Sequence, residues 1–332
     1  MTEIILTIGP ASSSTELIRR MNGIATRFRL NTGHLRPDQL REVLDRLAEE
    51  FTRSGKVLPV TLDLQGAKLR IGSYPSVETM PPSVELRFGA ASDDPGIIAV
   101  PHERFLRETQ PGDLLCLNDR RVILRVIRRS GETALHAECL QTGPLSARKG
   151  LNCPSRGYTL DAIPEGDRDS IGIGNRYPFV EYALSFVRDG SEAALFRPLT
   201  GTRRLIAKIE QPAALSALKA LDDAFDEHWL CRGDLGAEAD IRDLGRLQRS
   251  FIDAFPTLRK PKILAGEVLG STVKLPFPTR SEIVHLYDCL CTGFNGFVLS
   301  DETAQGGHVP EVLSFLEHFF STNSADSQTK NW

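Results

Sequence analysis

The sequence predicts an α/β fold: a TIM (β/α)8 barrel with an all-β domain inserted after its third strand. Three observations support this prediction. Strand-like and helix-like runs alternate over both ends of the chain, which is typical of a parallel sheet with crossover helices. Between residues 72 and 155 the alternation gives way to short runs of alternating hydrophobicity separated by Gly, Pro and Asp, which is typical of an all-β unit. Three predicted strands before this interruption and five after it make the eight strands of a barrel.

The first part of the barrel is predicted at residues 1–71. The strand "EIILTI" precedes a helix for which Ser13 and Glu16 form a predicted capping box. After the strand "ATRFRL" and the loop "NTGH", Pro37 opens the second helix at a position that favours proline. The run "VLPVTLDLQG" supplies the third strand.

The remaining elements follow the same reasoning. The insert at residues 72–155 contains the short runs "SVELRFG", "DLLCLN", "RVILRVIRR" and "TALHAECLQ". The barrel resumes at residues 156–322. Five runs there each contain a predicted strand and its carboxyl end: "EYALSFVR", "RLIAKIE", "EHWLCRGDLG", "KPKILAGE" and "GFVLSDETA". Residues 323–332 are polar and are expected to form a disordered tail.

Composition excludes several classes of function. The chain has 332 residues, 25% of them charged, and a net charge of −3, so no basic excess points to nucleic acid or to a membrane surface. No apolar run approaches the roughly 20 residues that span a bilayer. The amino terminus has no basic region before its apolar stretch, so we expect a cytoplasmic protein. The six cysteines and seven histidines are dispersed, which argues against a zinc site and favours reduced core cysteines.

The stretch "LIAKIEQP", residues 205–212, points to the functional end of the barrel. Lys208 and Glu210 stand two residues apart and therefore point to the same side of a strand. Burying both charges costs several kcal/mol each unless they meet partners, a metal or a ligand. Charged or polar residues end most other strands as well: Arg29, Asn31, Asp63, Arg188, Asp234, Glu267 and Glu302. Any single one fits a solvated strand end, but together they predict a site at the barrel mouth.

The residue types indicate which chemistry such a site performs. Glu210 and Asp234, on neighbouring strand ends, offer the hard oxygen ligands that Mg²⁺ prefers. Lys208 would face the same ligand and neutralise charge that develops in a reaction. Gly233 lets backbone N–H groups beside Asp234 approach an anion such as a carboxylate. The alternative reading, a buried ion-pair network without a ligand, stays open at this point.

The motifs also resemble those of a known family. This chain resembles the pyruvate kinase family in a series of motifs, which are, in order along the chain, "TIGPASSS", "RLNTGH", "LDLQGAKLRIG", "RKGLNCP", "SFVR", "IAKIEQ", "CRGDLGAE", "PFPTRSE" and "LSDETAQGG". The resemblance covers the barrel throughout and, more faintly, the insert, which would be the family's mobile lid. It implies phosphoryl transfer between phosphoenolpyruvate and a nucleoside diphosphate, with Mg²⁺ or Mn²⁺ as cofactor. The implied partners are small phosphate or carboxylate substrates and ADP or ATP, with no nucleic acid and no membrane.

The resemblance assigns roles to individual residues. The implied catalytic residues are Lys208, which stabilises the phosphoryl group in flight, and Arg29, which binds phosphate. The implied metal ligands are Glu210 and Asp234. The implied substrate-binding residues are Gly233, Asp234, Gly266 and Arg70. The implied nucleotide-binding residues are Asn31, His34 and Lys149, the last of which would reach the phosphates from the lid.

One departure from the family pattern concerns the monovalent cation. The family binds K⁺ partly through a serine and a threonine at positions where this chain has Gly33 and Leu64. Its "KGPE" reads "QGAK" here, which places Lys68 at the glutamate position. Family members with lysine there dispense with K⁺, because the tethered ammonium replaces the charge of the ion. We therefore expect Lys68, near Asp63, to substitute for the monovalent cation and K⁺ not to be required.

A second departure concerns the proton relay. The family's "ATQM" reads Ala265-Gly266-Glu267-Val268, and the missing threonine contacts the substrate carboxylate and takes part in protonating enolpyruvate. Loss of a general acid or base typically costs about 10²–10⁴-fold in rate. Glu267, which we count among the catalytic candidates, adds a negative charge close to the metal. The family's "DDG" and "SGET" also differ, reading Asn118-Asp119-Arg120 and Ser300-Asp301-Glu302-Thr303.

Finally, the sequence stops after the eighth predicted barrel helix, without the family's C-terminal domain. Allostery through that domain is therefore not expected, and a homodimer or monomer is favoured over a tetramer. Three functions remain: a phosphotransferase of pyruvate kinase type, a metal-enolate enzyme of another class (a lyase, condensation or group-transfer enzyme), and a catalytically silent binding protein. The nucleotide-binding candidates favour the first, Gly266 favours the second, and the retained metal ligands and lysine argue against the third.

Overall fold

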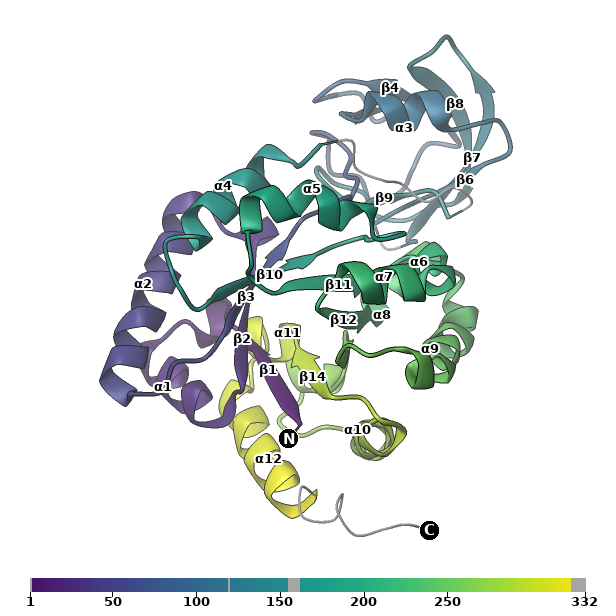
Figure 1. Cartoon of the computed structure of the whole chain (residues 1–332). Coiled ribbons are helices and arrows are strands. Elements are labelled where there is room, and N and C mark those ends of the chain that lie inside the picture. The colour runs from purple at the N-terminus through teal and green to yellow at the C-terminus, as the bar shows by residue number, and fades with distance from the viewer. Residues whose placement is uncertain (1, 119, 155–161, 324–332) are drawn as a thin grey trace.

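The computed structural model describes residues 2–118, 120–154 and 162–323 (Figure 1). Within these residues eight parallel strands close a barrel, in which β14 pairs with β1. Around the barrel the strands are β1 (Glu3–Thr7), β2 (Arg27–Asn31), β3 (Val60–Leu64), β10 (Val180–Leu184), β11 (Leu205–Ile209), β12 (Glu227–Cys231), β13 (Lys262–Ala265) and β14 (Gly296–Leu299). The predicted TIM barrel is confirmed.

Helices surround the strands on the outside (Figure 1). They are α1 (Thr15–Ile24), α2 (Pro37–Ser54), α4 (Glu165–Gly174), α5 (Ser191–Thr200), α6 (Pro212–Ser216), α7 (Leu218–Ala224), α8 (Arg232–Glu238), α9 (Leu244–Asp253), α10 (Arg280–Thr292), α11 (Asp301–Ala304) and α12 (Val309–Asn323). Short 3₁₀ turns occupy Pro10–Ser12, Thr32–His34, Ile241–Asp243, Phe255–Thr257 and Gly270–Val273. Within the described residues, no helix combines the length and apolar character needed to cross a bilayer.

The ends of two helices test the sequence reasoning. Pro37 is the first residue of α2, as predicted, and the helix ends at Ser54, followed by the cap residue Gly55, whose φ of 68° suits glycine. The predicted cap of α1 is wrong by one residue: Ser14 accepts the hydrogen bond from the Leu17 N–H, while Ser13 donates to the Pro10 carbonyl. A run of three serines contains several possible caps, and the entry angle of the chain selects one of them.

The insert follows β3 and forms its own six-stranded sheet, in the order β5-β4-β8-β7-β6-β9. Its strands are β4 (Ser83–Phe88), β5 (Ile97–Val100), β6 (Leu114–Leu117), β7 (Val122–Arg129), β8 (Ala134–Gln141) and β9 (Leu151–Asn152). A six-residue helix, α3 (Glu103–Glu108), adds a helical element that the sequence did not indicate. The sheet has a hydrophobic core of its own and stands to one side of the barrel (Figure 1).

The domain boundaries at residues 71, 155 and 322 stay predictions, although the barrel strands and insert strands fall on their expected sides. Of the predicted tail, all but residue 323 lies outside the described residues.

The barrel interior is filled by a small set of side chains. One cluster consists of Ile5, Ala183, Ile206, Trp229, Cys231, Ile263, Ala265 and Val298. Below this cluster, at the amino ends of the strands, the Arg27 guanidinium lies 2.7 Å from Glu227 and 3.0 Å from Glu181. The interior is therefore closed at its amino end by apolar packing and ion pairs, which leaves the carboxyl end for ligands.

Candidate active site

The charged strand ends meet at the mouth of the barrel, as the sequence predicts. A cavity of 1250 Å³ lies there, and its lining includes Arg29, Lys208, Glu210, Asp234, Gly266 and Glu267. Glu302 also lines the cavity, but its carboxylate accepts hydrogen bonds from the Leu269 and Ser300 N–H groups and is therefore occupied in holding the backbone. Asp63 and Arg188, the two remaining predicted strand-end charges, do not line this cavity.

Lys208 is the centre of a buried charge network. Its ammonium lies 2.9 Å from Asp63 Oδ1 and 2.8 Å from Glu210 Oε1, and it donates to Ser185 Oγ at 2.8 Å. Burial alone would lower the pKa of Lys208, but the carboxylates of Asp63 and Glu210 outweigh it and raise the pKa above its ordinary value. The ammonium is therefore charged at any physiological pH, although only 7% of the residue is exposed.

Arg29 is fixed in place by its neighbours. Its Nε and Nη2 donate to Asp63 Oδ2 at 2.8 and 2.6 Å, and its Nη1 donates to Thr7 Oγ1 at 3.1 Å. Burial would raise the pKa of Asp63, but Lys208 and Arg29 outweigh it and hold that pKa below its ordinary value. Asp63 thus orients two cations toward the cavity while remaining ionised.

Glu210 and Asp234 form a coupled pair of carboxylates. Glu210 is fully buried, and its Oε2 accepts the Phe186 N–H at 2.8 Å. Burial raises the pKa of Glu210, against the attraction of Lys208 and with added repulsion from Asp234. Burial would raise the pKa of Asp234 too, but Lys68 and Lys208 outweigh it and lower that pKa.

The carboxylate oxygens of Glu210 and Asp234 fit the coordination of a divalent cation. Lys208 Nζ lies near Glu210 Oε1, yet from the part of the chain that the structure describes this buried oxygen accepts no hydrogen bond of good geometry. Within the described residues no three His, Cys, Asp or Glu side chains gather as a ligand set, so the protein would supply two carboxylates. Two carboxylates, completed by substrate oxygens and water, suit Mg²⁺ or Mn²⁺ rather than Zn²⁺.

Lys68 stands beside this pair. Its Nζ lies 2.6 Å from Asp234 Oδ1 and 5.5 Å from the centroid of the Phe186 ring. The sequence grouped Lys68 with Asp63, whereas the structure pairs it with Asp234 and leaves Asp63 to Arg29 and Lys208.

The turn that carries Lys68 is held by residues that sequence reasoning missed. Asp167 accepts the Gln65 and Gly66 N–H groups at 2.9 Å each. Gly66 has a φ of 57°, and a Cβ there would lie 2.2 Å from the Ser185 carbonyl oxygen, so only glycine fits. Ser185 is the first residue of the "SFVR" motif and directly follows an apolar strand. Its position at a strand end is the sequence signal that could have identified it as a site residue.

Gly266 and Glu267 have unusual backbone conformations. Their φ angles are 87° and 49°, and Arg232 donates to both carbonyls, at 2.7 Å to Gly266 and 2.8 Å to Glu267. A Cβ on Gly266 would lie 3.0 Å from the Gly233 nitrogen. A threonine at position 266 would therefore need a different local backbone from the one that Arg232 holds in place here.

A second cavity of 520 Å³ adjoins the first, since Arg29 and Asp301 line both. Asn31 and His34 also line it. Burial lowers the pKa of His34, and the nearby charges of Arg70, Lys68 and Arg29 lower it further, so the imidazole is neutral at pH 7. The same cations favour an anionic ligand in this region.

Arg70 and Lys149 line neither cavity. They lie on the two segments that connect barrel and insert, where Arg70 forms an isolated bridge with Gly150 and Lys149 accepts the Ile71 N–H through its carbonyl. The Arg70 guanidinium donates to the Arg148 carbonyl at 3.0 Å. The structure therefore brings these two residues together, but at the base of the insert.

Fold and site together define a (β/α)8-barrel enzyme that gathers cations and carboxylates at the carboxyl ends of its strands. A family model described as the pyruvate kinase barrel domain matches residues 1–312. A pyruvate kinase from Agrobacterium vitis is 32% identical over 322 residues, which cover 95% of this chain and 67% of that protein. A pyruvate kinase from Thermotoga maritima is 28% identical, over 95% of this chain and 69% of that protein.

The chain belongs to the pyruvate kinase family, and with it to the transferases of phosphorus-containing groups. Among solved structures, a pyruvate kinase from Pyrobaculum aerophilum aligns with a TM-score of 0.85 at 23% identity, covering 96% of this chain and 73% of that one. At this level of identity the structural likeness supports the fold alone.

Proposed function

We propose that this protein catalyses Mg²⁺-dependent phosphoryl transfer between phosphoenolpyruvate and a nucleoside diphosphate. The observation that carries the proposal is the position of Lys208, an ammonium held by Asp63 and Glu210 at the edge of the large cavity. Phosphoryl transfer requires little covalent chemistry from the protein and depends on positioning and on charge stabilisation. A fixed, permanently charged lysine beside a carboxylate pair supplies both.

Each part of the site has a task in this reaction. Glu210 and Asp234 would hold Mg²⁺ or Mn²⁺, which supplies positive charge to the phosphate oxygens when bound. Lys208 stabilises the phosphoryl group in flight, and Arg29, oriented by Asp63, binds the phosphate. The Gly233 N–H and the backbone around Gly266 face the substrate carboxylate. Because these groups are held before substrate arrives, little reorganisation is needed during the reaction.

We assign the nucleotide to the second cavity. Asn31 and His34 line its wall, and Arg29 joins it to the phosphoryl-transfer site. Lys149 and Arg70 lie at the base of the insert, from which they reach the nucleotide and substrate phosphates when the insert moves toward the barrel. This assignment gives donor and acceptor adjacent sites, as direct transfer requires.

Lys68 takes the place of a monovalent cation in this proposal. Its ammonium contributes a positive charge next to Asp234, and Gly33 and Leu64 lack the side-chain oxygens that would bind K⁺. Turnover should therefore be independent of K⁺.

One observation favours a second function. Gly266 provides no hydroxyl to protonate an enolate, and Arg232 fixes this backbone. A metal-enolate enzyme of another class, a lyase, condensation or group-transfer enzyme acting on pyruvate or phosphoenolpyruvate, would use the same metal site without a nucleotide. Glu267, which lines the cavity, would then be the group available to move a proton.

Nucleotide binding distinguishes the two functions. We expect ADP to bind in isothermal titration calorimetry in the presence of Mg²⁺, and His34→Ala to weaken that binding by about tenfold, the loss of one or two hydrogen bonds. His318→Ala is the matched control, because His318 is exposed on α12 and lines neither cavity. Absence of ADP binding, together with Mg²⁺-dependent binding of phosphoenolpyruvate, would favour the metal-enolate enzyme.

A further inference from the structure

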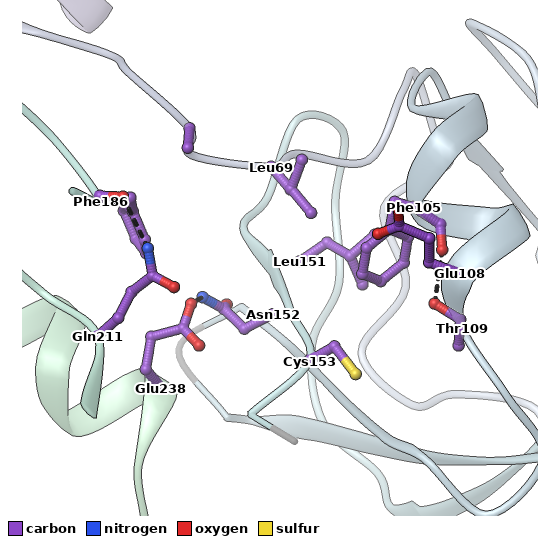
Figure 2. Close-up of a pocket in the computed structure, with 11 residues that line it drawn as sticks. Leu69, Phe105, Glu108, Thr109, Leu151, Asn152, Cys153, Phe186, Gln211 and Glu238 are labelled. Carbon is purple, nitrogen blue, oxygen red and sulfur yellow. Dashed lines mark hydrogen bonds between the residues drawn. The ribbon is translucent and has the colours of Figure 1, made fainter. Parts of the chain in front are cut away.

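Two hydrogen bonds connect the insert to the carboxyl end of α8. Asn152 Nδ2, on β9, donates to Glu238 Oε1, the last residue of the helix (Figure 2). Arg120 Nη1, from the hairpin between β6 and β7, donates to the carbonyl of Ala239 at 2.9 Å. Asn152 and Glu238 are both buried, with 8% and 7% of their surface exposed. Water therefore does not readily replace their hydrogen bond, and breaking it leaves buried polar groups unpaired.

Asn152 is the donor on which the Glu238 carboxyl depends. Figure 2 shows Leu69, on the connection from the barrel, and Leu151, on β9, beside the small cavity between the two units, where they offer no side-chain donor. Gln211, on the barrel side, donates its amide to the Phe186 carbonyl at 2.7 Å. Among the described residues, Asn152 is the side-chain donor to this carboxyl group, and the hydrogen bond is lost if the insert moves away. Burial accordingly raises the pKa of Glu238 to about 7.

Helix α8 connects this contact to the proposed metal site. Gly233 and Asp234 lie in its first turn, and Glu238 lies four residues after Asp234, one turn further along the same face. The helix spans seven residues, so a displacement at its end reaches its beginning without a flexible segment between them. Asp234 therefore moves with Glu238.

The insert reaches the barrel through a narrow connection next to this contact. The Leu151 N–H donates to the Leu69 carbonyl at 3.1 Å, and the Ile71 N–H donates to the Lys149 carbonyl at 3.0 Å. Asn152 directly follows Leu151 in this connection, so rotation of the insert about the connection changes the distance between Asn152 and Glu238.

Arg120 provides independent support. It has a φ of 62°, a conformation that a non-glycine residue rarely adopts, and its side chain still reaches the Ala239 carbonyl. Both connections thus end on consecutive residues, Glu238 at the end of α8 and Ala239 as its C-cap, and one of them is made from an unfavourable backbone conformation.

We propose that Asn152 and Glu238 are a positioning pair that couples the location of the insert to the Gly233–Asp234 turn, so that the affinity of the site for a divalent cation depends on the insert being in contact with α8. The proposal rests on the proposed metal site. Because coupling between two sites is reciprocal, cation binding also stabilises the contact between insert and helix.

The test uses Mn²⁺ alone, without substrate or nucleotide, with free Mn²⁺ measured by electron paramagnetic resonance. N152D places two carboxyl groups against each other and should weaken Mn²⁺ binding by about tenfold, within the usual range of coupling between sites. In N152D/E238Q the donor and acceptor exchange sides, so the hydrogen bond and the affinity should return. Hydrogen exchange of residues 149–153 should slow when Mn²⁺ binds to the wild type, and should not respond in N152D.

R120G tests the same coupling without burying a charge. Glycine adopts a φ of 62° freely, so this variant should not destabilise the insert, yet it should weaken Mn²⁺ binding by about threefold. A purely structural role predicts unchanged Mn²⁺ affinity in R120G, and that result overturns the proposal. Failure of the affinity to recover in a folded N152D/E238Q variant overturns it as well.

D234N separates the two proposals. If it abolishes Mn²⁺ binding and N152D binds like the wild type, the metal site stands and the coupling falls. If Mn²⁺ binds equally well to D234N and to the wild type, both proposals fall.

Discussion

Replacing Lys208 with methionine should reduce the rate of phosphoryl transfer by at least about 10³-fold, the effect expected when a cation that stabilises a transferring phosphoryl group is lost. Methionine keeps most of the aliphatic length but removes the ammonium that lies between Asp63 and Glu210. The loss should appear in kcat, because the charge acts on the group in flight and not on the bound ground state.

The variant should remain folded, because both carboxylates have other partners. Asp63 keeps the two hydrogen bonds from Arg29, and Glu210, whose pKa is already raised by burial, can take up a proton. Circular dichroism and Mn²⁺ binding check that the site persists. Lys219→Met, at a lysine that is 86% exposed, is the matched control and should keep full activity. A loss smaller than tenfold in a folded Lys208→Met variant would contradict the role assigned to Lys208.

Replacing Arg27 with methionine should destabilise the protein by about 3–5 kcal/mol, the usual effect of breaking a buried ion network by removing one partner. Arg27 is 2% exposed and contacts three carboxylates, at 2.5 Å to Glu3, 3.0 Å to Glu181 and 2.7 Å to Glu227. Burial raises the pKa of Glu3 and of Glu181 even with Arg27 present, so without it these groups lose their main counter-charge.

Equilibrium unfolding in urea measures this effect. Arg249→Met is the control, because Arg249 is 71% exposed and its pair with Asp253 is a surface contact worth about 0–1 kcal/mol. Adding Glu227→Gln to the Arg27 variant should recover part of the lost stability, since Glu227 is then a buried charge that keeps only Arg204 as a cationic partner among the described residues and repels Glu3 and Glu181. A destabilisation by Arg27→Met no larger than that of the control would show that the network does not hold the amino end of the barrel.

The sequence anticipated much of the fold because the barrel strands carry strong local signals. Apolar β-branched runs, proline at the start of α2 and a break in the alternation at the insert all depend on nearby residues. The helix α3 inside the insert was missed, since "ERFLRE" is too short to show helical periodicity.

The candidate site was predictable where strand geometry decides it. Lys208 lies on β11 and Glu210 directly follows its last residue, so alternation along the strand places both side chains on one side, and the structure brings them within 2.8 Å. The pairing of Lys68 with Asp234 was not predictable, because it depends on a turn that Asp167 holds from about a hundred residues further along the chain. Arg232 was missed for a similar reason: its task is to bind carbonyls of a distant loop.

The measurement that most directly tests the central claim is pyruvate formation from phosphoenolpyruvate and ADP with Mg²⁺, with and without K⁺. We predict pyruvate formation that requires Mg²⁺, depends on Lys208 and does not change when K⁺ is added. A large increase in rate on adding K⁺ would contradict the role of Lys68. No pyruvate formation, with phosphoenolpyruvate still bound in a Mg²⁺-dependent manner, would contradict phosphoryl transfer and assign the metal site to another reaction.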